Sequence, residues 1–236
     1  MNKVKYIAII PARKGSKRLP NKNIKNLNGR PLIEWTIEAA KNSRYIEEVL
    51  VSTNSEVIME ISEKMQASAP FKRPEELSTD IATTVEVLVH AIKFYEKKYM
   101  KEIENIILLQ PTSPLRTSHD IDNAIQYYEE KGANGVISVS ECDHPPLWAN
   151  KLPEDMSLDN FMNDKYKNIR SQDLPTYYRL NGAIYIWNKK CFLEEKQYFL
   201  KEKTYAFLMN KKNGIDIDDE LDFLIAQTIM KHNSNH

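Results

Sequence analysis

Short apolar runs alternate along the chain with longer segments in which apolar residues recur three and four positions apart. The short runs are rich in β-branched residues and free of charged ones, which is typical of strands buried on both faces. They are residues 6–10, 49–51, 106–109, 135–139, 182–187 and 204–209. The longer segments have the spacing of amphipathic helices. They are residues 31–40, 56–66, 83–99 and 118–131, followed by a last helix that ends near residue 231.

The order of these elements predicts an α/β fold. Strands and helices that alternate at this spacing favour a parallel sheet with right-handed crossover connections. We therefore expect a single domain that spans residues 1–236. Residues 141–178 break the pattern, because they are rich in Pro, Asp and Asn and have scattered aromatics without a clear period. A structureless loop of that length is unusual in a compact domain, so this stretch predicts a protruding subdomain or a subunit contact.

The chain carries 33 basic and 33 acidic residues, so its formal net charge is zero. No overall field therefore favours nucleic acid or an anionic membrane. Cys142 and Cys191 are too few for a disulfide framework and lack metal-ligand spacing, which predicts reduced thiols. The sequence has neither a membrane span of roughly 20 apolar residues nor the apolar stretch of a signal peptide before its first strand. These observations predict a cytoplasmic protein that is not embedded in a membrane.

A strongly basic loop follows the first predicted strand, which Pro11 ends. Its five cations are Arg13, Lys14, Lys17, Arg18 and Lys22. Like charges this close repel one another unless an anion lies between them, and a triphosphate is the obvious candidate. The alternative is a mobile, solvated loop, but ligands of open α/β sheets bind beyond the carboxyl ends of strands. The loop has one glycine and matches neither common glycine-rich phosphate motif, so side chains would have to hold the phosphates.

A second candidate for chemistry is the acidic stretch Asp216-Ile-Asp218. In a strand, residues two apart point the same way, so both carboxylates would share a face while Ile217 points into the core. Two carboxylates this close favour a hard cation such as Mg²⁺ between them. The alternative is an acidic helix amino terminus, because Asp219 and Glu220 follow directly. These residues alone leave both interpretations open.

The basic loop resembles the A-R-x-x-S-K-x-x-x-x-K-N signature of the acylneuraminate cytidylyltransferases, which include the CMP-sialic acid synthetases. Every fixed position of that signature is present, namely Ala12, Arg13, Ser16, Lys17, Lys22 and Asn23. The runs Gln110-Pro-Thr-Ser-Pro-Leu-Arg116 and Arg179-Leu-Asn-Gly-Ala-Ile-Tyr185 match further family motifs, and the family carries D-I-D at the place of Asp216 and Asp218. The resemblance implies a Rossmann-like three-layer sandwich of the nucleotide-diphospho-sugar transferase type, with a mostly parallel sheet and a protruding dimerisation segment.

The resemblance also implies roles for individual residues at a CTP site. Arg13 and Lys22 would hold the triphosphate and act in catalysis together with Asp216 and Asp218, which would bind Mg²⁺, with Mn²⁺ as a substitute. Residues that would support the loop or bind the nucleotide are Ala12, Ser16, Lys17, Asn23, Arg73, Ala82 and Thr84. From the sequence alone, Arg73 would have been placed on the surface.

A second group of residues would bind the acceptor sugar, according to the same resemblance. An amide such as Gln110 both donates and accepts hydrogen bonds, which suits a polyhydroxylated sugar, although it could instead cap the loop between two prolines. The group is Gln110, Arg170, Asn181, Tyr185, Tyr198 and Phe199. Tyr198 and Phe199 would close the sugar pocket from the other subunit of a homodimer. Arg170 lies one residue further from the following Leu-Pro than in many family members.

The implied reaction joins CTP to an N-acylneuraminate, giving CMP-N-acylneuraminate and diphosphate. The sequence does not identify the general base or the sugar, and legionaminic acid is an alternative acceptor. Enzymes for 3-deoxy-manno-octulosonate typically have Lys-Pro in place of Lys22-Asn23, and pseudaminic acid enzymes usually lack the run at residues 110–116. A non-catalytic sugar-nucleotide-binding module would have no reason to retain Asp216 and Asp218. Neutral net charge without a second basic patch argues against nucleic-acid binding.

Overall fold

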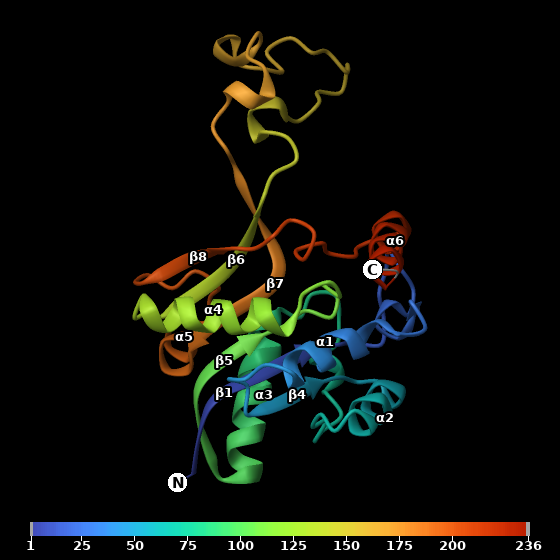
Figure 1. Ribbon diagram of the computed structural model, residues 1–236, viewed down its shortest axis with the longest axis vertical. Coiled ribbons are helices and arrows are strands. Elements are labelled where there is room, and N and C mark those ends of the chain that lie inside the picture. Colours follow the sequence, from blue (N-terminus) through green and yellow to red (C-terminus); the bar gives the residue numbers. More distant parts are fainter. Residues whose placement is uncertain (1, 235–236) are drawn as a thin grey trace.

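A six-stranded sheet forms the centre of the protein, in the order β4-β1-β5-β7-β6-β8. The computed structural model describes residues 2–234 (Figure 1). The strands are β1 (Asn2–Pro11), β4 (Glu48–Ser52), β5 (Lys101–Leu108), β6 (Gly135–Glu141), β7 (Tyr178–Asn188) and β8 (Thr204–Leu208). β7 runs antiparallel to β5 and β6, whereas the other neighbours pair in parallel. The predicted mostly parallel α/β sheet is confirmed.

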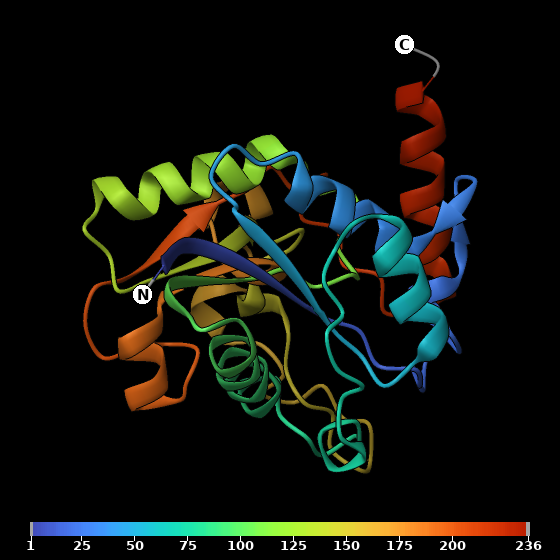
Figure 2. The same ribbon diagram turned by 90° about the horizontal axis from the view of Figure 1, so that it is seen from below.

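Helices cover both faces of the sheet, which makes three layers (Figure 2). They are α1 (Leu32–Lys41), α2 (Glu56–Lys64), α3 (Thr84–Tyr99), α4 (Ser118–Glu130), α5 (Lys189–Glu195) and α6 (Glu220–Ser234). On one face, α1 and α4 bury an apolar stripe that includes Ile37 and Ile125, and on the other face α3 buries one that includes Leu88 and Ile92. α6 packs separately, over Leu19 and Leu115. Burial of these stripes is the main term that holds the layers together.

Local signals read from the sequence set most helix boundaries. The Ser55 hydroxyl accepts a hydrogen bond from the backbone N–H of Ile58, as its predicted role as a helix cap requires. Thr83 begins α3 with a capping box to Glu86. The Asn28-Gly29 turn joins the two short strands β2 (Asn26–Leu27) and β3 (Arg30–Pro31). Five 3-10 turns complete the structure: η1 (Lys22–Ile24), η2 (Glu75–Leu77), η3 (Pro146–Trp148), η4 (Asp164–Tyr166) and η5 (Ser171–Asp173).

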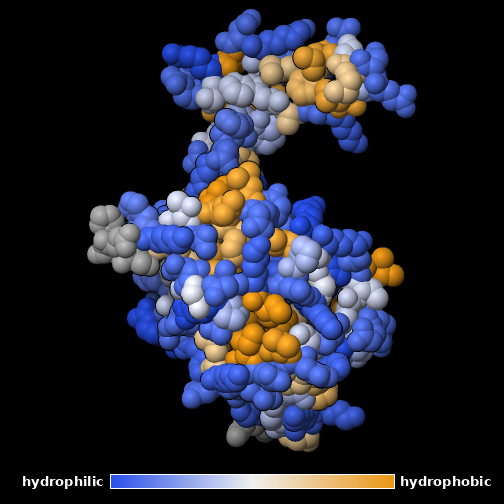
Figure 3. Space-filling view, turned by 90° about the vertical axis from the view of Figure 1, so that its right-hand side faces the viewer, coloured by the Kyte–Doolittle hydropathy of each residue, from blue (hydrophilic) through white to orange (hydrophobic). Residues whose placement is uncertain are grey.

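Residues 142–177 form an arm that extends away from the sheet, beyond the ends of β6 and β7 (Figure 1). In the space-filling view the arm is joined to the body by a narrow neck, and apolar side chains gather on it (Figure 3). Leu152, Met156 and Leu158 are 51, 65 and 67% exposed. Exposed apolar clusters of this kind mark interaction surfaces. The role of the arm as a subunit contact stays a prediction.

The sequence did not predict α5. This helix has seven residues and begins directly after β7, where the side chain of Asn188 accepts a hydrogen bond from the N–H of Cys191. Two turns are too short for a helical period to stand out from the preceding strand. None of the helices within residues 2–234 has the length and apolar composition that crossing a bilayer requires.

Candidate active site

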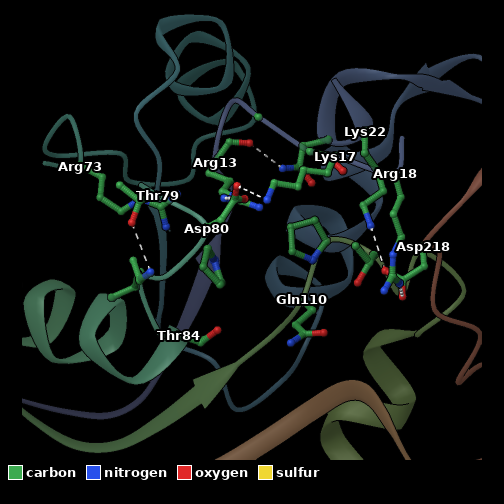
Figure 4. Close-up of a pocket in the computed structure, with 18 of the residues that line it drawn as sticks. Arg13, Lys17, Arg18, Lys22, Arg73, Thr79, Asp80, Thr84, Gln110 and Asp218 are labelled. Atoms are coloured by element: carbon green, nitrogen blue, oxygen red, sulfur yellow. Dashed lines mark hydrogen bonds and ion pairs between the residues drawn. The ribbon is translucent and has the colours of Figure 1, made fainter. Parts of the chain in front are cut away.

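A cavity of about 500 Å³ opens beyond the carboxyl ends of β1 and β5. The basic loop forms one wall, the loop before α3 forms another, and the segment after β5 lies at the base with Gln110 (Figure 4). The acidic pair Asp216 and Asp218 lies beside the basic loop, although about 195 residues separate the two in sequence. Parallel strands bring such distant segments together because their carboxyl ends share one edge of the sheet.

Four of the five cations of the basic loop line this cavity: Arg13, Lys17, Arg18 and Lys22. Lys14 is not among the described lining residues, and its backbone N–H donates to the side chain of Asn54. Anchoring contacts fix the loop at both ends. Ala12 is fully buried and its N–H donates to the carbonyl of Ser52, while the side-chain amide of Asn23 donates to the carbonyl of Arg13.

Lys22 joins the basic loop to the acidic segment. Its side chain is only 10% exposed, and its ammonium group donates to the carbonyl of Ile217 and lies 3.5 Å from a carboxylate oxygen of Asp218. The Arg18 guanidinium lies 2.6 Å from the other oxygen of Asp218. A ligand that carries several negative charges would meet four cations on one side of the cavity, a density that favours phosphate groups.

The acidic segment is not a strand, contrary to the prediction from the sequence. Residues 215–218 pair with no neighbouring strand in the described chain, and the N–H of Ile217 donates to the carbonyl of Thr112 at 2.8 Å. Ile217 is fully buried and holds the segment against the core below α6. This anchor leaves both aspartates lining the cavity, as the alternating pattern requires. The helix begins only at Glu220.

Asp216 has the features of a cation ligand. Burial raises the pKa of its carboxyl group, and the nearby Asp218 charge adds to the shift. Its Oδ1 atom is buried and has no hydrogen-bond partner within residues 2–234. An orphaned carboxylate oxygen beside a second carboxylate fits a hard divalent cation. The described residues contain no group of three His, Cys, Asp or Glu side chains that could hold a metal alone, so substrate phosphates would have to supply further oxygens.

Arg73 lies on the opposite wall and is only 4% exposed, whereas the sequence alone would have placed it on the surface. Its Nε donates to the hydroxyl of Ser78, and its Nη2 has no partner in the described chain. Burial, together with the charge of Arg13, lowers the pKa of Arg73 to about 10. A buried guanidinium with a free donor fits a polar ligand. Ala82 and Thr84 line the cavity on the same side.

Gln110 lines the cavity and faces Gly182 of β7, whose φ of +76° few residues other than glycine adopt. A Cβ atom on residue 182 would lie 2.7 Å from Oε1 of Gln110. Tyr185 packs in the core below, with its ring 5.5 Å from that of Trp187, and burial raises the pKa of Tyr185 to about 12. Tyr185 therefore supports this wall without belonging to the cavity lining described here.

Three predicted sugar contacts lie elsewhere in the structure. Asn181 is 1% exposed; its side-chain oxygen accepts a hydrogen bond from the hydroxyl of Ser138, and its side-chain N–H donates to the hydroxyl of Ser140, beside a β-bulge. Arg170 lies on the arm, 73% exposed, and pairs with Asp173 at 2.8 Å. Tyr198 packs edge-on against Tyr185 of its own chain at 5.3 Å, and its contact with another subunit stays a prediction.

Ser16 and Lys17, from the basic loop, also line the cavity, while Phe199 is 58% exposed and its predicted role stays open. Sequence reasoning gave no role to Leu77 and Val87, which also line the cavity. Nothing in the local pattern marks these two apolar residues as cavity lining, because the position of their segments at the cavity depends on the sheet. Asp80 lies 2.6 Å from Arg13 and 2.7 Å from Lys17.

Comparison with known proteins decides the family. A family model described as cytidylyltransferase matches residues 7–226, which is most of the chain. The chain belongs to the cytidylyltransferase family. It is 41% identical over 224 residues to an N-acylneuraminate cytidylyltransferase of Streptococcus agalactiae serotype V, covering 94% of this chain and 52% of that protein. The chain thus spans about half the length of the first curated relatives that it matches.

Another relative matches this chain over nearly the full length of both. The CMP-N,N'-diacetyllegionaminic acid synthase of Legionella pneumophila subsp. pneumophila is 35% identical over 237 residues, which cover 98% of each chain. The solved structure of a CMP:2-keto-3-deoxy-manno-octonic acid synthetase complexed with CTP superposes with a TM-score of 0.68 at 18% identity, covering 97% of this chain and 99% of that one. At this identity the superposition establishes that the two chains share a fold.

Replacing Gly182 by alanine (Gly182→Ala) should both destabilise the protein and disturb Gln110. The positive φ costs about 1–3 kcal/mol for a residue with a Cβ atom, and the new methyl group collides with the Gln110 amide. Gly29→Ala is the matched control, because Gly29 has a φ of +94° but no atom within 4 Å of the added Cβ. We expect both variants to melt at lower temperature. If Gln110 holds an acceptor sugar, as the sequence predicts, only Gly182→Ala should raise KM for that sugar, and an unchanged KM would contradict this role of Gln110.

Proposed function

We propose that this protein transfers the CMP group of CTP to an N-acylneuraminate and releases diphosphate. The observation that carries the proposal is the cavity at the ends of β1 and β5, where four cations of one loop face two aspartates from the other end of the chain. Cations that converge on one wall suit a triphosphate, and Arg73, Ala82 and Thr84 suit the nucleoside beside it. Names of relatives that share the family support the same reaction.

In the proposed reaction, the oxygen of the anomeric hydroxyl forms a bond to the α-phosphorus of CTP. The bond between that phosphorus and the bridging oxygen of the β-phosphate breaks, diphosphate leaves and the hydroxyl proton is released. Arg13, Lys17 and Lys22 stabilise the charge that builds up on the phosphate oxygens. Gln110 orients the sugar opposite the nucleotide. Most of the acceleration then comes from positioning and electrostatics, and no side chain is needed as a covalent nucleophile.

Asp216 and Asp218 would hold the Mg²⁺ ion that this chemistry uses, with Mn²⁺ as a substitute. When bound, such an ion neutralises phosphate charge and stabilises the leaving diphosphate. Asp216 and Asp218 themselves supply two carboxylates at the cavity wall. Lys22 contributes by holding the carbonyl of Ile217, between the two aspartates.

A second acceptor, N,N'-diacetyllegionaminic acid, is favoured by one specific observation. The Legionella synthase matches this chain over 98% of both lengths, whereas the streptococcal relative extends well beyond the match. Legionaminic and neuraminic acids share the carboxylate and the anomeric centre, so the same catalytic wall would serve either. The protein would work in the cytoplasm, where CTP is made and where its two unpaired cysteines remain reduced.

Release of diphosphate tests the reaction. The protein is mixed with CTP and Mg²⁺, and N-acetylneuraminic acid, N,N'-diacetyllegionaminic acid or no sugar is added. We expect release only when CTP and one of the two sugars are both present, and the ratio of kcat/KM values identifies the acceptor. Release without sugar would indicate a nucleotide hydrolase. No release with either sugar, from a folded protein that binds CTP, would contradict the proposed reaction.

We also propose that the arm, residues 142–177, joins two copies of the chain into a homodimer. Its exposed Leu152 and Leu158 fit an apolar contact of the kind that subunit interfaces bury. The double variant Leu152→Glu, Leu158→Glu should convert a dimer into monomers when mass is measured by light scattering after gel filtration. Leu221→Glu on α6, where Leu221 is 66% exposed, serves as the control and should remain dimeric. A monomeric wild-type protein would contradict the dimer.

A further inference from the structure

The cavity contains a carboxylate that the proposed reaction does not use. Asp80 lies in the loop between η2 and α3, and its two oxygens contact two different cations of the basic loop across the cavity (Figure 4). Oδ1 lies 2.6 Å from Nη1 of Arg13, and Oδ2 lies 2.7 Å from Nζ of Lys17. Within residues 2–234, Asp80 is the only carboxylate that pairs with either cation. One anionic group bridging two cations is the arrangement that a phosphate group would make at the same place.

The other two carboxylates of the cavity differ from Asp80 in this respect. Asp218 pairs with Arg18 and Lys22, at the far end of the basic loop, and Asp216 has an orphaned oxygen that fits a cation. Both therefore have a part in the proposed metal site. Asp80 lies away from that site and pairs with the other two cations of the cavity, Arg13 and Lys17. Its charge therefore opposes the binding of an anion there and does not serve the metal.

The loop that carries Asp80 has its own support. The hydroxyl of Ser78 donates to the carbonyl of Pro74, and the hydroxyl of Thr79 donates to the carbonyl of Glu76 and accepts from the N–H of Ala82. The capping box of α3 then holds Thr83. These contacts do not involve the Asp80 side chain, so loss of its charge should leave the loop backbone in place.

We propose that Asp80 is an internal counter-ion that occupies Arg13 and Lys17 until a nucleotide phosphate displaces it, and so sets the affinity for the triphosphate. The inference rests on the proposed nucleotide site. Both cations must exchange a carboxylate for phosphate oxygens on binding, and the carboxylate must return to solvent. Because the Asp80 side chain is 43% exposed and Lys17 is 76% exposed, the exchange is inexpensive and reversible.

Asp80→Asn tests this inference, because it keeps the shape of the side chain and removes its charge. Glu76→Gln is the matched control, since Glu76 is exposed in the same loop and has no ion pair among the residues described. Dissociation constants for CTP and for inorganic tripolyphosphate are measured by calorimetry at low and high salt. We expect Asp80→Asn to bind both about three- to tenfold more tightly at low salt, with a smaller gain at high salt, and Glu76→Gln to match the wild type.

The two ligands separate this inference from the proposed function. Tighter tripolyphosphate binding by Asp80→Asn without any binding of CTP would support the counter-ion and contradict the cytidylyltransferase reaction. Weaker binding by Asp80→Asn would overturn the inference, because Asp80 would then be a residue that positions Arg13 for the nucleotide. Equal affinities of wild type and variant, including no detectable binding by either, would also overturn it.

Discussion

Replacing Asp216 by asparagine (Asp216→Asn) should lower kcat/KM of the proposed transfer by about a thousandfold, which is the largest effect we expect of a single substitution. The carboxylate is mostly buried, and its Oδ1 has no partner in the described part of the chain. Asparagine keeps the shape but supplies neither the charge nor the second anionic oxygen that a hard cation requires. A steady-state assay over a range of Mg²⁺ concentrations measures the effect, and higher Mg²⁺ should recover little of the activity.

Thermal unfolding distinguishes this loss from misfolding. Burial disfavours the Asp216 charge more than nearby Lys22 favours it, so removing that charge should leave Tm unchanged or slightly higher. Asp219→Asn is the control, because Asp219 is exposed at the start of α6, and asparagine can still accept the hydrogen bond from the N–H of Asp222. Near-normal turnover of Asp216→Asn with an unchanged Mg²⁺ dependence would contradict the metal site. It would favour the alternative that the acidic residues only stabilise the amino terminus of α6.

Arg13→Ala should lower kcat/KM for CTP by about a hundredfold to a thousandfold, because it removes one of the cations aimed at the phosphates. The side chain is 35% exposed and carries no core packing, so the variant should fold. The same substitution frees Asp80 from its pair with Arg13 and leaves Lys17 as its sole cation. Initial rates at varied CTP concentration measure the loss.

Lys14→Ala provides a matched control for the Arg13 variant. It removes the same charge one residue further along the basic loop, but Lys14 does not belong to the described cavity lining. If the effect depends on the overall charge of the loop, the two variants will lose activity equally. If the effect depends on whether the cation lines the cavity, as the geometry indicates, kcat/KM of Lys14→Ala will stay within about threefold of the wild type. Exposed charges at a distance from the site are screened by salt.

Several features of the fold followed from local patterns. Apolar β-branched runs identified all six strands of the main sheet, because a strand buried on both faces leaves little choice of side chain. The starts of β1, β5 and β7 were missed, because charged and polar residues interrupt the apolar runs there. The helix cap at Ser55 and the turn at Asn28-Gly29 could be predicted from the sequence, because each depends on contacts within a few residues.

Other features depended on the resemblance to a family. The sequence motif placed Arg73 and Gln110 in one site, and the structure brings both to the cavity. Residue chemistry alone could not do so, because Arg73 is buried only where the loop before α3 folds over it. The motif also selected Asn181 and Tyr185, which the structure places beneath the cavity wall, where they support their neighbours.

By itself, the sequence determined the six strands of the main sheet, five of the six described helices, and the cluster of cations that follows the first strand. Those properties arise from contacts between residues that are close along the chain. Tertiary structure alone decided that Asp218 contacts Arg18 and Lys22, that Asp80 bridges Arg13 and Lys17, and that Lys14 is not among the described residues that line the cavity. Such pairs form between segments up to 200 residues apart, so they depend on how the sheet orders its strands, and no local pattern encodes that order.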